Sequence, residues 1–109
     1  MAWIVDNGRV LASAELLDSP RARAKGLLGR PGVAGVVVLQ PCRWIHSIGL
    51  RFPIDVAYLD RDGKVIKVSQ VGRHRLCAPV WHARTVIEAE AGAFARWELR
   101  VGDVIEITP

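Results

Sequence analysis

The sequence predicts a mostly β, α+β fold: a single compact domain resembling a small β-barrel or sandwich, with one short helix near residues 20–28. The apolar stretches are short and rich in valine and isoleucine, which favours strands over helices. Hairpin-type turns separate these stretches at short intervals, as in small barrels and sandwiches. One Ser-Pro pair, Ser19-Pro20, is typical of the start of a helix.

The first elements are a hairpin and the helix. Asn7-Gly8 tolerates the positive φ angles of a type I′ turn, so residues 3–5 and 10–16 are predicted to pair as antiparallel strands. The helix follows from Pro20 to about Leu28. Gly29 is suited to end it, because glycine readily adopts the left-handed conformation.

The rest of the chain continues as short strands, for a total of seven or eight. Residues 35–39 form an apolar run that is too short for a helix and is predicted as a buried strand. Residues 44–50 are ambiguous, residues 72–79 read as an irregular basic loop, and residues 91–97 as a short turn or helix. Further strands are predicted at residues 54–59, 64–71, 85–89 and 104–108.

Length and composition predict one globular domain over residues 1–109, since half of the residues are hydrophobic and about a quarter are charged. The net charge of +4 favours encounters with polyanions. A nucleic-acid partner is possible but not favoured, because the aromatic residues are not interleaved with the basic ones. A small ligand or a protein partner is expected instead. The basic residues form two clusters: Arg21, Arg23, Lys25 and Arg30, then Arg61, Lys64, Lys67, Arg73 and Arg75.

The expected compartment is the cytoplasm. Two cysteines, Cys42 and Cys77, are too few for a disulfide framework and are expected to stay reduced. No apolar run reaches the roughly 20 residues of a membrane span. The first residues lack the basic start and apolar core of a signal peptide.

The candidate site lies in the segment from Cys42 to Val65, where polar and titratable side chains are dense beside strong strand signals. Glu88 lies within another apolar strand, where a carboxylate is costly to bury unless it is paired or hydrogen-bonded. The candidate ligand-binding residues are Trp44, His46, Ser47, Arg51, Asp55 and Glu88.

Four blocks of sequence, taken in order, resemble the bacterial and archaeal family called domain of unknown function 192. They are residues 23–30 (RAKGLLGR), residues 52–65 (FPIDVAYLDRDGKV), residues 86–92 (VIEAEAG) and Gly102-Asp103. Many members read Trp-Met-Lys-Asn-Thr before the second block, whereas this chain resembles a variant with His46-Ser47-Ile48-Gly49 there. The resemblance covers roughly residues 16–107. It implies a β-rich single domain and no agreed activity.

Asp55 allows two interpretations. It either ties a loop or the helix to the sheet, which is favoured, or it acts in catalysis, and Arg51 and Arg23 are its expected partners. His46, Ser47 and Asp55 contain the residue types of a catalytic triad. However, His46 and Ser47 would point to opposite faces of a strand, and the serine lacks a nucleophile-elbow context.

No metal or cofactor is predicted. Cys42, His46, His74 and Cys77 supply the residue types of a zinc site, but their spacing does not match a compact finger. Whether these four side chains converge is left open. Asp60-x-Asp62-Gly63 lacks the later acidic ligands of a calcium loop and is predicted to be a hairpin turn.

The favoured function is a non-enzymatic binding or accessory module, with a polar cleft around His46, Arg51 and Asp55. One alternative is a small hydrolase or transferase that uses His46 and Asp55 as acid and base. The second is electrostatic nucleic-acid binding through the arginines.

Overall fold

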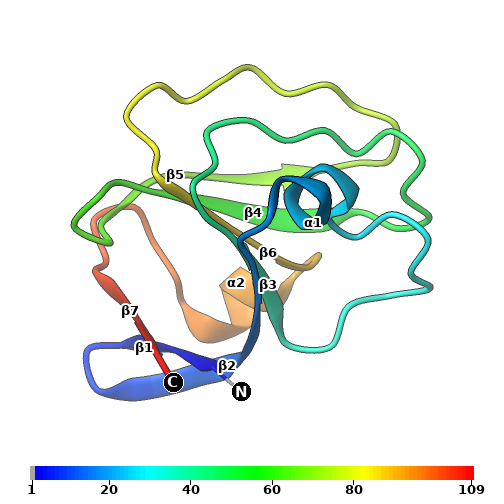
Figure 1. Ribbon diagram of the computed structural model, residues 1–109. Helices are drawn as coiled ribbons and strands as arrows, with labels where there is room; N and C mark the ends of the chain where they lie inside the picture. The colour runs from blue at the N-terminus through cyan, green and yellow to red at the C-terminus, as the bar shows by residue number, and fades with distance from the viewer. Residues whose placement is uncertain (1) are drawn as a thin grey trace.

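The computed structural model describes residues 2–109 as one seven-stranded sheet with two short helices (Figure 1). The mostly β fold class is confirmed. The order of strands across the sheet is β5-β4-β6-β3-β2-β1-β7. Within the described residues, no helix is long and apolar enough to cross a membrane. The elements are β1 (Ala2–Asp6), β2 (Arg9–Leu17), α1 (Pro20–Lys25), β3 (Val36–Leu39), β4 (Ile54–Leu59), β5 (Val65–Val71), β6 (Thr85–Glu90), α2 (Ala93–Trp97) and β7 (Ile105–Thr108).

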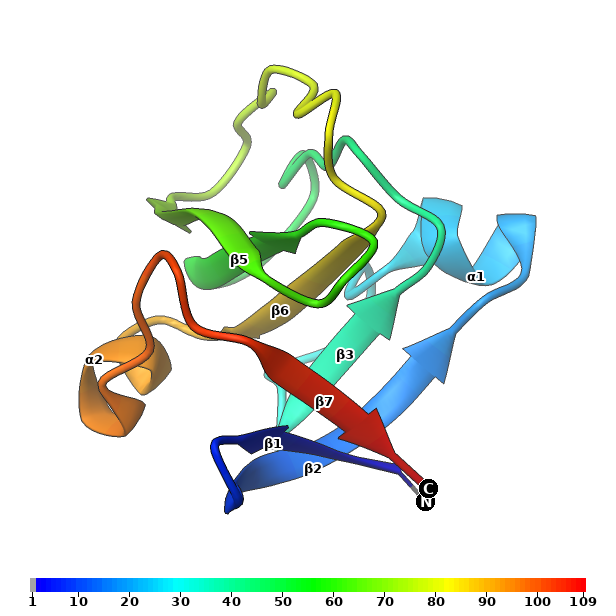
Figure 2. The ribbon, with the colours of Figure 1, turned by 90° about the vertical axis from the view of Figure 1, so that its left-hand side faces the viewer.

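The sheet curls into a half-barrel. All neighbouring strands are antiparallel except β2 and β3, which run parallel. The end of the chain returns to the β4–β5 turn, where Lys64 and Val104 form an antiparallel bridge (Figures 1 and 2). The amide of Val65 donates to the Asp103 carbonyl at 2.8 Å, and the amide of Ile105 donates to the Gly63 carbonyl at 2.9 Å. These bonds join the two outer strands at one end.

Two turns depend on positive φ angles. Asn7 and Gly8 have φ values of 50° and 80°, as a type I′ hairpin requires, and β1 pairs with β2 as predicted. Gly63 has a φ of 83°, and a Cβ atom there would lie 2.6 Å from the carbonyl oxygen of Ile105. Only glycine therefore lets β7 approach the β4–β5 turn this closely.

Helix α1 begins where the sequence predicts but ends earlier. The Ser19 hydroxyl accepts a hydrogen bond from the Ala22 amide at 3.1 Å, which caps the first turn. The predicted end at Leu28 is wrong, because Gly26 rather than Gly29 leaves the helix, with a φ of 50°. The residues after Gly26 form turns, and one of them, Leu27, is buried against the sheet.

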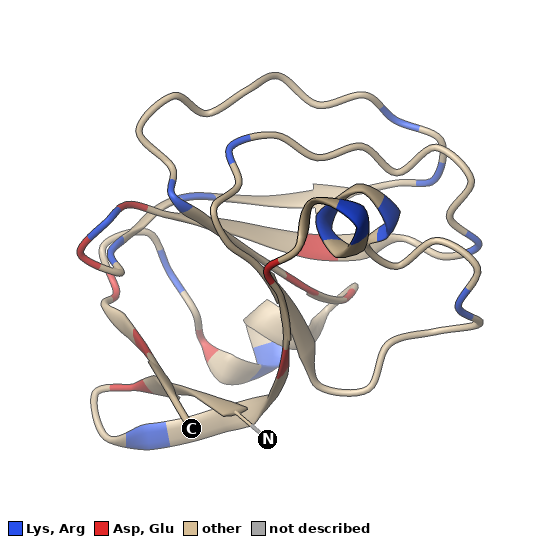
Figure 3. Cartoon of the chain, viewed as in Figure 1, with Lys and Arg blue, Asp and Glu red and all other residues tan. Residues whose placement is uncertain are grey.

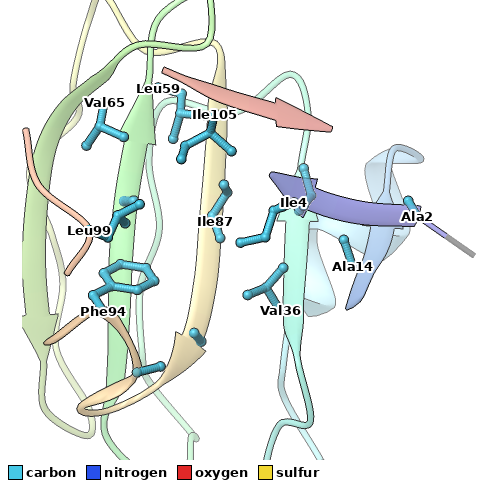
Figure 4. Close-up of a cluster of buried hydrophobic side chains, with 14 residues drawn as sticks. Ala2, Ile4, Ala14, Val36, Leu59, Val65, Ile87, Phe94, Leu99 and Ile105 are labelled. Atoms are coloured by element: carbon cyan, nitrogen blue, oxygen red, sulfur yellow. The ribbon is translucent and has the colours of Figure 1, made fainter. Parts of the chain in front are cut away.

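The two faces of the sheet bury separate cores. The inner core fills the half-barrel and includes Phe94 of α2, Leu99, Leu59 and Ile87 (Figure 4). The outer core includes Val56 and Val86. Its cover is called here the cap: α1 with the loop that follows it (residues 19–35) and two long loops (residues 40–53 and 72–84). In Figure 1 the two long loops lie above β4 and β5, and the segment after α1 runs down the right-hand side to β3.

Candidate functional site

Asp55 and Glu88 lie on neighbouring strands but face opposite sides of the sheet. In the register of β4 with β6, Asp55 is opposite Ala89 and Val56 is opposite Glu88. Successive side chains of a strand alternate between the faces. Glu88 therefore points to the outer core with Val56, whereas Asp55 points to the inner core with Ala89.

The carboxylate of Asp55 anchors α2. One of its oxygens accepts hydrogen bonds from the amides of Gly92 and Phe94, both at 3.0 Å, and Gln70 donates to the other at 3.3 Å. Gly92 is the N-cap of α2 and has no side chain of its own to satisfy these amides. Asp55 supplies the missing cap from β4. The expected arginine partners are replaced by backbone amides.

Glu88 differs from Asp55, because its carboxyl is buried without a hydrogen bond or an opposite charge that would offset the cost of burial. It stands between Val37 of β3 and Val56 of β4 in the centre of the sheet, with 4% of its surface exposed. Burial raises the pKa of its carboxyl to about 7, and no charge or hydrogen bond from residues 2–109 offsets this rise. At neutral pH the group is both an available proton donor and an acceptor.

A pocket of about 300 Å³ opens onto Glu88 between α1, the outer face of the sheet and the loop of residues 40–53. Most of its wall is apolar, with charged groups at α1 and aromatic rings on the loop. Its lining residues are Arg23, Ala24, Lys25, Gly26, Leu27, Leu28, Leu39, Cys42, Trp44, Ile45, His46, Leu50 and Glu88.

The end of α1 passes directly over the carboxyl. A Cβ atom at Gly26 would lie 3.6 Å from Oε1 of Glu88. Arg23 lines the same pocket, and its guanidinium donates to the Asp18 carbonyl. Only two ion pairs occur among residues 2–109, Arg30–Glu15 and Arg96–Glu90. Arg23 and Glu88 thus share a pocket without pairing to each other.

The loop wall combines two rings and a thiol. The rings of Trp44 and His46 are 5.4 Å apart and tilted by 50°. Nδ1 of His46 accepts the Ile48 amide at 3.3 Å, so the neutral ring carries its proton on Nε2. The Cys42 thiol donates to the Trp44 carbonyl at 3.2 Å, and burial raises its pKa. A thiol in this state is a weak nucleophile.

Ser47 holds the cap loops together. Its hydroxyl is fully buried, donates to the Gly72 carbonyl at 2.6 Å and accepts from the Arg75 amide at 2.8 Å. Its backbone amide donates to the Arg75 carbonyl, and its carbonyl accepts from the His74 amide. The hydroxyl proton is therefore held in a hydrogen bond between the two long loops of the cap.

The six candidate residues separate into three groups. The pocket brings together Trp44, His46 and Glu88, while Ser47 lies in the loop junction behind it. Arg51 is exposed and does not line the pocket, and Asp55 faces the other side of the sheet. The alternative in which His46 and Asp55 act as an acid–base pair is therefore not supported by the geometry.

The possible zinc ligands do not converge. Across residues 2–109, no three His, Cys, Asp or Glu side chains gather closely enough to hold a metal ion. Nδ1 of His74 instead accepts the Gly49 amide at 3.1 Å, and His74 itself adopts a positive φ of 58°. Like Ser47, His74 joins the two long loops.

Sequence reasoning did not name Gly26 or Leu50 as site residues, and it expected Arg23 beside Asp55 rather than in the pocket of Glu88. Arg23 and Gly26 belong to the block of residues 23–30 that resembles the family pattern. The sequence therefore marked this block, but it did not indicate that these residues line a pocket. Their contribution depends on the packing of α1 against β6, which local patterns do not encode.

Comparison with known proteins shows which solved structures share this fold and to which family the chain belongs. No curated protein matches the chain in sequence. A crystal structure of a protein of unknown function from Novosphingobium aromaticivorans has a TM-score of 0.80 at 18% identity, over 96% of this chain and 82% of that one. One described as a "putative transcription regulator" from Sinorhizobium meliloti has a TM-score of 0.79 at 22% identity, over 96% and 90%. The family model of domain of unknown function 192, described as "Uncharacterized ACR", matches residues 1–107, and the chain belongs to this family.

Proposed function

We propose that the chain is a binding module for a small amphipathic molecule, which occupies the pocket beneath α1 and hydrogen-bonds to Glu88. The observation that carries the proposal is a buried carboxyl, without a partner charge, facing an apolar pocket. Small-molecule sites are commonly apolar with a few polar groups that fix orientation. A volume of about 300 Å³ suits a small ligand.

The chemistry of the pocket limits the ligand. Leu27, Leu39 and Leu50 favour an apolar body, and Glu88 requires a polar group that can donate to or accept from a carboxyl. A hydroxyl or an amide meets this need in either protonation state. No residue of the described chain hydrogen-bonds to the Glu88 carboxyl, which lines the pocket, so a ligand there would add this bond, a gain of about 1 kcal/mol.

Binding is favoured over covalent catalysis because the pocket supplies no activated nucleophile among the described residues. The raised pKa of Cys42 keeps its thiol protonated, and the Ser47 proton is held by the Gly72 carbonyl. A second candidate function follows from one observation: the pKa of Glu88 near 7 and the imidazole of His46 suit proton transfer to a bound substrate. Such an enzyme would use Glu88, not Asp55.

The test is an amide NMR titration of labelled protein with pools of small amphipathic alcohols and amides. We expect shifts at Arg23, Gly26 and Trp44, and a loss of affinity of about tenfold in Glu88→Leu, whose side chain cannot form the hydrogen bond to the ligand. Glu106→Leu, on the exposed side of β7, is the matched control and keeps the wild-type affinity. Shifts confined to other surfaces, or equal affinity in Glu88→Leu, would contradict the proposal. Chemical conversion of a bound compound would favour the second candidate.

A further inference from the structure

Charge is divided unequally between the two halves of the molecule. The cap carries nine Lys or Arg residues and no Asp or Glu, whereas the rest of the chain carries the other six Lys or Arg and all eleven Asp or Glu. The formal charges of the halves are therefore +9 and −5. Figure 3 shows the blue segments of α1 and the long loops above the sheet. A separation of this kind orients a protein toward a negative surface.

Most of the positive charge in the cap is free to meet a partner. Only Arg30 of the cap belongs to an ion pair within residues 2–109. Arg51, Arg73 and Arg75 are exposed at one end of the two long loops. The backbone there is fixed, because Ser47 bonds to Gly72 and Arg75.

Exposed apolar side chains accompany these arginines. Ile48 is 48% exposed and Leu76 is 70% exposed, and the loops that carry them are joined by the bridge between His46 and Leu76. Trp44 is 43% exposed on the same loop as Ile48. Large apolar side chains held outward by a rigid loop pair are poorly explained by packing within the chain.

We infer that the cap docks on the surface of an anionic phospholipid bilayer, with Ile48 and Leu76 inserted among the acyl chains and Arg51, Arg73 and Arg75 on the headgroups. The inference is independent of the pocket's ligand. Lipid is favoured over nucleic acid because the exposed apolar side chains nearest Arg51, Arg73 and Arg75 in the sequence, Ile48 and Leu76, are aliphatic. The aromatic Trp81, 71% exposed, lies elsewhere on the cap, beside Arg43 and Arg84. Aliphatic groups gain from contact with hydrocarbon and cannot stack on bases as aromatic ones do. Tryptophan and arginine are both suited to the boundary between headgroups and chains.

The test is sedimentation with vesicles made either of phosphatidylcholine alone or of phosphatidylcholine and phosphatidylglycerol in equal parts. We expect binding to the anionic vesicles, little to the neutral ones, and a decline with added salt. The double variant Ile48→Ser/Leu76→Ser should bind at least about tenfold more weakly, because it loses inserted apolar surface. Arg73→Gln/Arg75→Gln should lose roughly thirtyfold.

The matched control is Val10→Ser/Val101→Ser, which removes two apolar side chains of similar exposure, 58% and 61%, outside the cap. It should bind as the wild type does. Thermal unfolding of each variant verifies that the fold is kept. Equal binding of the cap variant and the control would overturn the inference. So would affinity for a short oligonucleotide that depends on the arginines and not on Ile48 and Leu76, since this would assign the cap to nucleic acid.

Discussion

Asp55 and Glu88 are carboxylates on adjacent strands of one sheet, and they point to opposite faces with opposite consequences. Asp55 is satisfied by the amides of Gly92 and Phe94, so it serves the fold. Glu88 has no such compensation and faces a pocket. Burial alone therefore does not separate structural from functional acids; their hydrogen-bond partners do.

Replacing Asp55 should destabilise the protein through α2. In Asp55→Ala the amides of Gly92 and Phe94 lose their acceptor while remaining largely buried, which costs about 2 kcal/mol. Asp55→Asn keeps one acceptor oxygen and should lose less. Chemical denaturation measures both values. An unfolding free energy for Asp55→Ala within about 0.5 kcal/mol of wild type would contradict the anchoring role.

Glu88 should make stability depend on pH. The carboxyl ionises near its ordinary pKa of 4.5 when the chain is unfolded, but keeps its proton to about pH 7 when folded. Its stabilising contribution is complete below pH 4.5 and is lost as the pH rises to 7. The change is on the order of 3 kcal/mol.

The comparison with Glu88→Gln isolates this contribution. The titratable groups that share the pocket with Glu88 and also enter the comparison are Arg23 and Lys25 of α1 and, from the loop of residues 40–53, Cys42 and His46. Glu88→Gln should lose the decline between pH 4.5 and 7 and exceed wild-type stability at pH 8. Parallel stability curves for wild type and Glu88→Gln would contradict the raised pKa.

Ser47→Ala should loosen the cap without unfolding the sheet. The variant leaves the Gly72 carbonyl and the Arg75 amide without their buried partner, at a cost of about 1–3 kcal/mol. Hydrogen exchange should accelerate at Arg75 while the amides of β6 stay protected. Ser69→Ala, on a partly exposed position of β5, is the control. Unchanged exchange at Arg75 would show that the hydroxyl does not hold the loops.

Gly63 should be required for closing the half-barrel. Gly63→Ala faces both a positive φ and the Ile105 carbonyl at 2.6 Å. Gly8→Ala has a similar φ of 80° and no atom within 4 Å, so it reports the backbone strain alone, about 1 kcal/mol. Thermal unfolding should show a larger loss for Gly63→Ala. Equal losses of stability in the two variants would mean that the close contact between residue 63 and the Ile105 carbonyl does not affect stability.

Local patterns in the sequence predicted the elements well. The Asn7-Gly8 hairpin, the start of α1 at Ser19-Pro20 and the buried run in β3 all depend on neighbouring residues, and all are present. The end of α1 was misplaced because two glycines compete for it, and Gly26 is the one that leaves the helix. Both glycines adopt a positive φ, 50° at Gly26 and 81° at Gly29, so the local pattern alone did not choose between them.

Which residues form the pocket depends on the pairing of strands that are distant in the sequence, and local patterns do not predict this pairing. Asp55 and Glu88 look alike in sequence, each flanked by apolar strand residues. Which face each one occupies follows from the register of β4 with β6 and from the positions of α1 and α2. The density of polar residues near His46 did indicate part of the pocket. It also included Ser47 and Arg51, whose side chains do not line it.

The measurement that tests the account most directly is the ¹³C NMR titration of the Glu88 side-chain carboxyl, assigned by comparison with Glu88→Gln. We expect a midpoint near pH 7 in the free protein, as its burial implies. The midpoint should move when an amphipathic alcohol or amide that binds the pocket is added. A midpoint near 4.5 that no such compound moves would contradict the account, because Glu88 would then be an ordinary solvated carboxylate rather than the polar group of a binding pocket.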